Sequence, residues 1–172
     1  MNSKMIFALI MIFGIIITGC KQTEEKTEVE EVKVDLINDE FPEQKAEVMA
    51  LMDELTETIK SGDVDKLIAF HAYGPKFTEF TGGGKRVGSK ENEETERGIF
   101  GNVTEVVKFN YDDLKIAVYG DVANVTFHSD FHMKFGEDEV IVNDQITLLL
   151  VKTDAGWKCV HEHHSPLNKE EG

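Results

Sequence analysis

Apolar side chains recur at helical spacing in the first part of the folded chain. They lie three or four positions apart after Pro42, which suits the first turn of an amphipathic helix. Asp63 is placed to cap a second, shorter helix. The pattern before Asn102 predicts helices over residues 42–61, 64–71 and 89–100, with a short strand over residues 77–81.

Apolar and polar residues alternate after Asn102, and this change of period indicates β-strands. The alternation is clearest around Phe127 and Phe131, where every second side chain is apolar. Helices followed by strands indicate an α+β domain, in which the helices cover one face of a curved antiparallel sheet. Short polar or glycine-containing segments separate five predicted strands, over residues 103–111, 114–119, 122–135, 140–152 and 157–165.

The first twenty residues have the pattern of a bacterial export signal. An apolar stretch at residues 6–17 follows Lys4, and it is shorter than the roughly 20 residues that span a membrane. The segment before Cys20 resembles a lipobox, after which cleavage leaves a lipidated cysteine. We therefore expect a signal peptide at residues 1–19, a palmitate-bearing lipid anchor on Cys20, and an extracytoplasmic position in the cell envelope, periplasmic or at the outer membrane if the host is Gram-negative. An ordinary secretory signal cut near Gly19 is the alternative.

Acidic residues outnumber basic ones, with 33 Asp and Glu against 18 Lys and Arg and a net charge of −15. Such a surface repels phosphate backbones, so we expect no nucleic-acid partner and membrane contact through the lipid alone. Residues 20–41 hold much of the excess and are interpreted as an acidic, disordered tether. The folded domain is expected over residues 42–168, with a tail at 169–172. With Cys20 lipidated, Cys159 has no disulfide partner, so the fold relies on burial.

Three segments carry a resemblance to a known family: residues 61–68 (SGDVDKLI), 120–125 (GDVANV) and 156–165 (GWKCVHEHHS). In their order and spacing they resemble the SnoaL-like branch of the nuclear transport factor 2-like superfamily. The resemblance implies a cone of bent antiparallel sheet, a cystatin-like α+β barrel wrapped on its N-terminal helices, with a cavity at the wide end. It also implies dimers in many members, and we expect a homodimer. Residues 71–76 (HAYGPK) offer no match to the aspartate base of the isomerases.

Histidines concentrate in the last predicted strand, where side chains alternate between two faces. Without a bulge, His161 and His163 share a face with Trp157, and the resemblance turns that face toward the cavity. His164 then lies on the outer or dimer face. A single bulge would exchange these assignments. The predicted pocket-lining residues are His71, Tyr73, Phe77, Phe80, Phe127, Phe131, Trp157, His161 and His163.

His161 and His163 are open to four interpretations: structural imidazoles, donors to a ligand, an acid and base pair, or metal ligands. A third metal ligand is missing, and Cys159 lies too far along the strand, so no metal site or cofactor is expected. The favoured function is a lipid-anchored, non-catalytic domain that binds a small apolar or aromatic molecule. Its alternatives are a cyclase, dehydratase or isomerase type of enzyme using His161 or His163, and a dimeric assembly module without a ligand.

Overall fold

The computed structural model describes residues 33–168, and one compact unit begins at Val34. Its helices confirm the apolar spacing: α1 (Pro42–Ser61), α2 (Val64–Phe70) and α3 (Ser89–Phe100). The Asp63 carboxylate accepts a hydrogen bond of 3.1 Å from the Lys66 backbone N–H and so caps α2, as predicted. No helix in the described part of the chain is long and apolar enough to cross a membrane. The expected signal peptide, the lipidated Cys20 and the tail lie outside the described residues.

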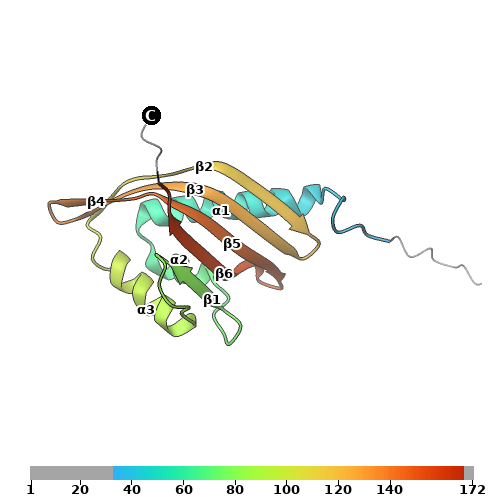
Figure 1. Cartoon of the computed structure of the whole chain (residues 1–172), viewed down its shortest axis with the longest axis horizontal. Coiled ribbons are helices and arrows are strands. Elements are labelled where there is room, and N and C mark those ends of the chain that lie inside the picture. Colours follow the sequence, from blue (N-terminus) through green and yellow to red (C-terminus); the bar gives the residue numbers. More distant parts are fainter. Residues whose placement is uncertain (1–32, 169–172) are drawn as a thin grey trace, which may run out of the picture. The chain divides into compact units, whose positions relative to one another are not determined.

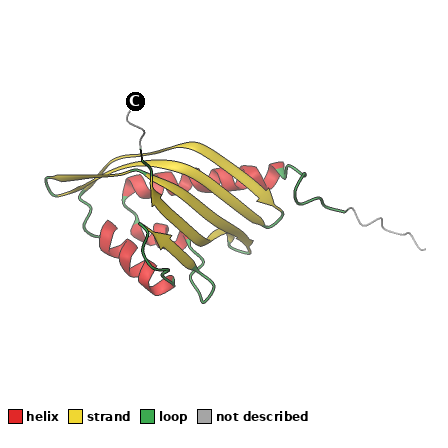
Figure 2. Cartoon of the chain, viewed as in Figure 1, coloured by secondary structure: helices red, strands yellow, loops and turns green. Residues whose placement is uncertain are grey.

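Within residues 33–168, six strands form one curved sheet whose concave side faces the helices (Figures 1 and 2). Their order is β1-β6-β5-β3-β2, and β4 pairs with β3. Neighbours are antiparallel except β1 and β6, which are parallel. The α+β class is confirmed, and β1 adds a parallel edge to the expected meander. The strands are β1 (Thr78–Thr81), β2 (Glu105–Tyr119), β3 (Val122–Phe135), β4 (Asp138–Val142), β5 (Asp144–Thr153) and β6 (Gly156–Pro166).

Two predicted strand boundaries are wrong. The acidic pair at Asp112 and Asp113 does not end a strand, because β2 continues through it with an irregularity and a positive φ of 49° at Asp113. Conversely, the strand expected over residues 140–152 is interrupted at Asn143. β4 and β5 nevertheless keep one register against β3, since Val142 pairs with Phe131 and Gln145 with His128.

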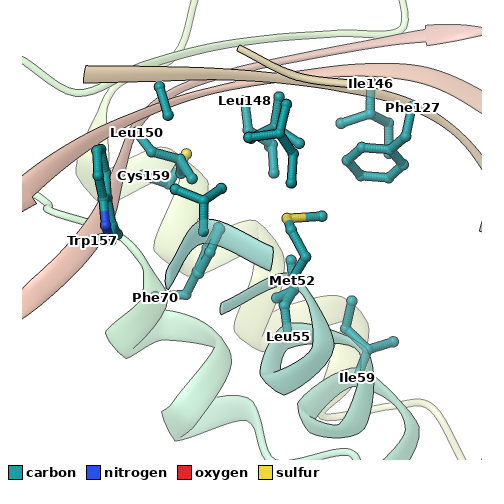
Figure 3. Close-up of a cluster of buried hydrophobic side chains, with 14 of the residues drawn as sticks. Met52, Leu55, Ile59, Phe70, Phe127, Ile146, Leu148, Leu150, Trp157 and Cys159 are labelled. Atoms are coloured by element: carbon teal, nitrogen blue, oxygen red, sulfur yellow. The ribbon is translucent and has the colours of Figure 1, made fainter. Parts of the chain in front are cut away.

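The core forms between one face of α1 and the inner face of the sheet. Figure 3 shows Met52 and Leu55 of α1 facing Leu148 and Phe127 of the sheet. Met52 is 1% exposed and Leu150 fully buried, so close packing here leaves little room for a change of side-chain volume. This burial explains how the described domain holds together with a single free, buried cysteine, Cys159.

The start of β6 is tied to α1 by a buried tryptophan. Trp157 is 5% exposed, and its indole N–H donates a 2.8 Å hydrogen bond to Glu47 of α1. Lys152 of β5 lies 2.7 Å from the same carboxylate. Hydrogen bonds from Lys152 and Trp157 hold the pKa of Glu47 below its usual range. The polar edge of the indole is thus satisfied while its rings pack in the core.

A β-bulge divides β6 into two parts. Leu150 of β5 pairs with Cys159 and the preceding Leu149 with His161, so Val160 is the extra residue. Side chains before the bulge and after it therefore follow different alternations. Trp157 and Cys159 are buried before it, and Glu162 is buried after it.

The described end of the expected tether contains a local turn. The Asp35 side chain accepts hydrogen bonds from the backbone N–H groups of Ile37 and Asn38 at 3.0 and 3.1 Å. Phe41, at the entry to α1, packs against the core cluster. Acidic composition alone predicts neither contact. It does not show that an aspartate side chain can accept hydrogen bonds from nearby backbone N–H groups and so form a turn.

Candidate ligand-binding cavity

A cavity of about 330 Å³ lies between the helices and the inner face of the sheet. Most of its wall is apolar; Leu55 and Ile59 of α1 face Phe127 and Ile146 of the sheet in Figure 3. Three lining residues, Thr81, Thr95 and Ile99, are exposed and mark its opening beside α3. Its titratable lining residues are His71, Glu79, Glu96, Asp144, Glu162 and His164.

The bulge in β6 reverses the expected orientation of the C-terminal histidines. Glu162 and His164 line the cavity, whereas His161 and His163 do not. His163 is exposed, and Nδ1 of His161 lies 2.9 Å from both the hydroxyl and the carbonyl oxygen of Thr78. The prediction that His161 and His163 point into the cavity is wrong. It assumed an unbroken strand, whereas the extra residue Val160 shifts the alternation of the following side chains by one position.

The other predicted lining residues divide into three groups. His71, Phe127 and Phe131 line the cavity as expected. Tyr73 and Phe77 do not line it but support His71: the Tyr73 ring stacks on the imidazole at 4.9 Å, and the Phe77 ring meets its edge at 5.6 Å. Phe80 is 41% exposed, and Trp157 is buried against Glu47, so both lie outside the lining.

His71 and Glu162 form a buried ion pair. The imidazole Nε2 lies 2.7 Å from Oε1 of Glu162, and the two side chains are 2% and 7% exposed. Burial alone would lower the pKa of His71, but the hydrogen bond and charge of Glu162 raise it above its ordinary value. Burial alone would raise the pKa of Glu162, but His164 and His71 together hold it well below its usual range. Both shifts favour a protonated imidazole opposite a carboxylate.

His164 flanks the same carboxylate from the other side. Its Nε2 lies 3.6 Å from Oε2 of Glu162, and its Nδ1 lies 3.9 Å from Asp144. Burial would lower the pKa of His164, but the carboxylate of Glu162 raises it. Neither separation is short enough for a good hydrogen bond, so both ring nitrogens of His164 are available to a molecule in the cavity.

Glu79 completes the polar end of the cavity. It is 7% exposed, and one carboxylate oxygen accepts a 2.8 Å hydrogen bond from the Asn92 side-chain amide. Asn92 is 1% exposed, and its own oxygen accepts a hydrogen bond from the Tyr73 hydroxyl. Burial and nearby carboxylates raise the pKa of Tyr73, so the hydroxyl keeps its proton and remains the donor. This chain of contacts fixes the orientation of Glu79.

Glu96 of α3 is a carboxyl group in the cavity lining whose pKa lies near neutrality. Burial, followed by the charge of Glu162, raises its pKa to about 7. Its carboxyl group makes no hydrogen bond or ion pair with the residues described by the structure. It can therefore accept or donate a proton near neutrality, or hydrogen-bond a polar group of a bound molecule.

Comparisons with known proteins agree with this architecture. Residues 48–169 match the SnoaL-like domain. A proposed dehydratase of the nuclear transport factor 2-like family from Streptomyces avermitilis is similar in structure, with a TM-score of 0.66, 21% identity, and coverage of 74% of this chain and 99% of that one. A proposed scytalone dehydratase from Novosphingobium aromaticivorans has a TM-score of 0.61 and 14% identity, with coverage of 72% of this chain and 83% of that one.

A nuclear transport factor 2-like protein from Cytophaga hutchinsonii has a TM-score of 0.60 and 14% identity, with coverage of 72% of this chain and 98% of that one. No curated protein sequence matches the chain. At these identities the structural likeness establishes the fold and leaves the chemistry to the residues of the cavity.

Proposed function

Since the chain belongs to the SnoaL-like domain family, we propose that it is a lipid-anchored extracytoplasmic protein that binds a small, mainly apolar molecule in its cavity. The cavity carries this proposal. Its volume of about 330 Å³ is at the lower end of the range for small-molecule sites, roughly 300 to 1,000 Å³. An apolar wall with polar groups clustered at one end suits an aromatic or aliphatic body with one polar head.

The apolar wall supplies affinity and the polar end supplies orientation. Burial of apolar ligand surface contributes about 25 cal/mol per Å², so an apolar body of small aromatic size gains several kcal/mol before the entropic cost of binding. Glu96 and His164 have unused hydrogen-bonding capacity in the lining, and Nδ1 of the lining residue His71 has no hydrogen-bond partner within residues 33–168. A hydroxyl, carbonyl or amine on the ligand would use it.

Ligand binding is tested by narrowing the opening. We would titrate the full-length protein in detergent with water-soluble aromatic alcohols, ketones and amines, which partition little into micelles, and measure heats of binding. Ile99→Trp adds bulk at the opening, where Ile99 is 40% exposed. Val107→Trp is the matched control at a site that is 44% exposed and outside the lining. We expect Ile99→Trp alone to weaken binding; equal affinity in both variants would place the ligand elsewhere.

The anchor is tested separately. The proposal rests on the apolar stretch at residues 6–17 and the lipobox-like segment that ends at Cys20. Metabolic labelling with a palmitate analogue should mark the wild-type protein, which should partition with membranes. Cys20→Ala should abolish both properties. Persistence of label or of membrane association in Cys20→Ala would exclude this anchor.

A second function, acid–base catalysis of the dehydratase or cyclase type, is favoured by Glu96. A half-buried carboxyl group with a pKa of about 7 inside a ligand cavity has the proton affinity that general acid–base chemistry needs at neutral pH. Glu96 and His164 replace His161 and His163 as candidates. Compounds that bind would be incubated with the protein and followed by mass spectrometry. Glu96→Gln should bind but not convert them; undiminished conversion would exclude Glu96.

An assembly module without a ligand finds less support. That alternative predicts a sealed or very small cavity and an apolar outer sheet face. The outer face of β3 instead carries His128, Asp130 and His132, and Asp130 pairs with Lys108 and His132. A homodimer remains our prediction, and light scattering on the detergent-solubilised protein would test it.

A further inference from the structure

We propose that Glu79, Glu162 and His164 form a binding site for one divalent transition-metal ion at the polar end of the cavity. One ligand atom from each lies within 4.8 Å of the others, and all three side chains line the cavity. The proposal stands on these residues alone and does not require an organic ligand.

The strand register brings the three groups together. Glu79 of β1 pairs directly with Glu162 of the parallel β6, and His164 follows two residues later on the same face. Like charges directly opposite each other on neighbouring strands are destabilising. Burial makes this worse, because Glu79 is 7% and Glu162 5% exposed. The arrangement is one that a bound cation would stabilise.

The buried charge is compensated at only one of the two carboxylates. Glu162 has His71 at 2.7 Å. Glu79 receives a neutral amide hydrogen bond from Asn92, and no cationic side chain pairs with it among residues 33–168. A buried carboxylate without a cation is costly. A divalent ion bound by two carboxylates and a neutral imidazole gives a complex with no net charge.

The separations fit metal ligands better than hydrogen bonds. Nε2 of His164 lies 3.6 Å from Oε2 of Glu162, beyond the usual hydrogen-bond range. Two ligand atoms that each lie about 2.1 Å from a tetrahedral zinc ion are about 3.4 Å apart. A shift of a few tenths of an ångström would close this pair on an ion, and a carboxylate oxygen of Glu79 lies within 4.8 Å of both atoms.

Outer contacts already orient two of the three ligands. Asn92 holds one oxygen of Glu79, and His71 holds Oε1 of Glu162, which leaves Oε2 turned toward His164. Such partners of the ligating groups are typical of metal sites and tune their affinity. The set of two oxygens and one imidazole nitrogen suits Zn²⁺, Fe²⁺ or Mn²⁺. Three protein ligands leave a coordination position open to the cavity.

The test uses the full-length protein without a polyhistidine tag, purified in detergent and stripped with a chelator. Zn²⁺ and Mn²⁺ are titrated by calorimetry, and Co²⁺ is followed by its visible absorption. We expect one saturable equivalent and a raised melting temperature. Glu79→Gln, which keeps the shape of the side chain, and His164→Ala should each weaken binding by about 100-fold or more, and Asn92→Ala by about 10- to 100-fold.

His163→Ala is the matched control, because it removes an exposed imidazole beside His164 on the same strand but outside the cavity. It should bind as wild type does. The proposal is overturned if none of the three ions binds the wild-type protein with a saturable equivalent, if Glu79→Gln and His164→Ala bind as tightly as wild type, or if His163→Ala loses the ion. Organic ligands titrated in the presence of chelator report separately on the proposed function.

Discussion

The two parts of β6 show how one strand can serve two purposes. Before the bulge, Trp157 and Cys159 are buried in the core and their roles follow from simple alternation. After it, Glu162 and His164 face the cavity and carry its charge. A single extra residue, Val160, separates the part of β6 that packs in the core from the part whose charged side chains line the cavity. In β6, side chains that pack in the core and side chains that line the cavity are therefore separated along the strand, on the two sides of the bulge.

The parts also differ in what compensates their burial. The core part is stabilised by apolar contact and by one hydrogen bond from Trp157 to Glu47. The cavity part depends on charge pairing, since Glu162 is buried between His71 and His164. Loss of an apolar side chain leaves a space, whereas loss of one ion-pair partner leaves a buried charge. Substitutions in the two parts should differ in how much unfolding free energy they cost and in how that cost depends on pH.

The largest effect is expected from Glu162→Ala. It leaves His71 buried without its partner, and breaking a buried pair in this way costs about 3–5 kcal/mol. Urea denaturation of the detergent-solubilised protein at pH 7 measures the change. His163→Ala, on the exposed face of the same strand, should change stability by less than about 0.5 kcal/mol. Equal stability of the two variants would mean that the ion pair contributes nothing.

The core part should respond next most strongly, and without pH dependence. Leu150 is fully buried and packs in the same cluster as Cys159. Leu150→Ala should destabilise the protein by about 2–5 kcal/mol through lost burial and a new void. The loss should be the same at pH 5 and pH 8, since Leu150 carries no charge. A strong pH dependence would indicate that the charged cluster also depends on packing around Leu150.

Removal of the bulge should have a smaller effect. Val160 and His161 together oppose Leu149, so deletion of Val160 restores regular pairing and keeps Glu162 on the cavity face. We expect a loss of about 1–3 kcal/mol with ligand or metal binding retained. Deletion of His163 is the control, because it turns His164 away from the cavity. If both deletions abolish binding alike, the bulge itself is required.

The helices and the core were predictable because their signals are local and repeated. The apolar period of α1 fixes which face is buried, and Asp63 marks a helix start by its own hydrogen bond. Trp157 and Cys159 were placed together on one face by alternation, and both are buried. These features depend on side chains a few residues apart, which a single sequence displays directly.

The cavity was not predictable in the same way, because its polar end depends on the bulge and on long-range pairing. No residue type near Val160 indicates a β-bulge. Alternation alone therefore assigns His161 and His163 to the wrong face of β6. Glu79 and Glu96 resemble surface acids in a chain with 33 acidic residues. Their burial follows from the parallel pairing of β1 with β6 and from the position of α3, neither of which has a local signal.

The smallest effect is expected from Glu96→Gln and should be visible as a change in pH dependence. The folded protein holds a proton on Glu96 up to a pH of about 7, while the unfolded chain loses it near 4.5. Between these values the folded state binds more protons, so the contribution of Glu96 to stability falls as pH rises and is constant above pH 7.

Relative to Glu96→Gln, the wild-type protein should therefore lose about 1 kcal/mol between pH 5 and pH 8, because the side chain is partly open to solvent in the cavity. The charge of Glu96 also raises the pKa of His71 and of His164, so the difference reports Glu96 together with its coupling to these two histidines. Denaturation of the two proteins in parallel at several pH values measures it. A difference in stability that does not change between pH 5 and pH 8 would show that Glu96 titrates as a surface carboxylate. Glu96 would then be excluded as a group that exchanges a proton near neutral pH, while the charged cluster on β6 would be unaffected.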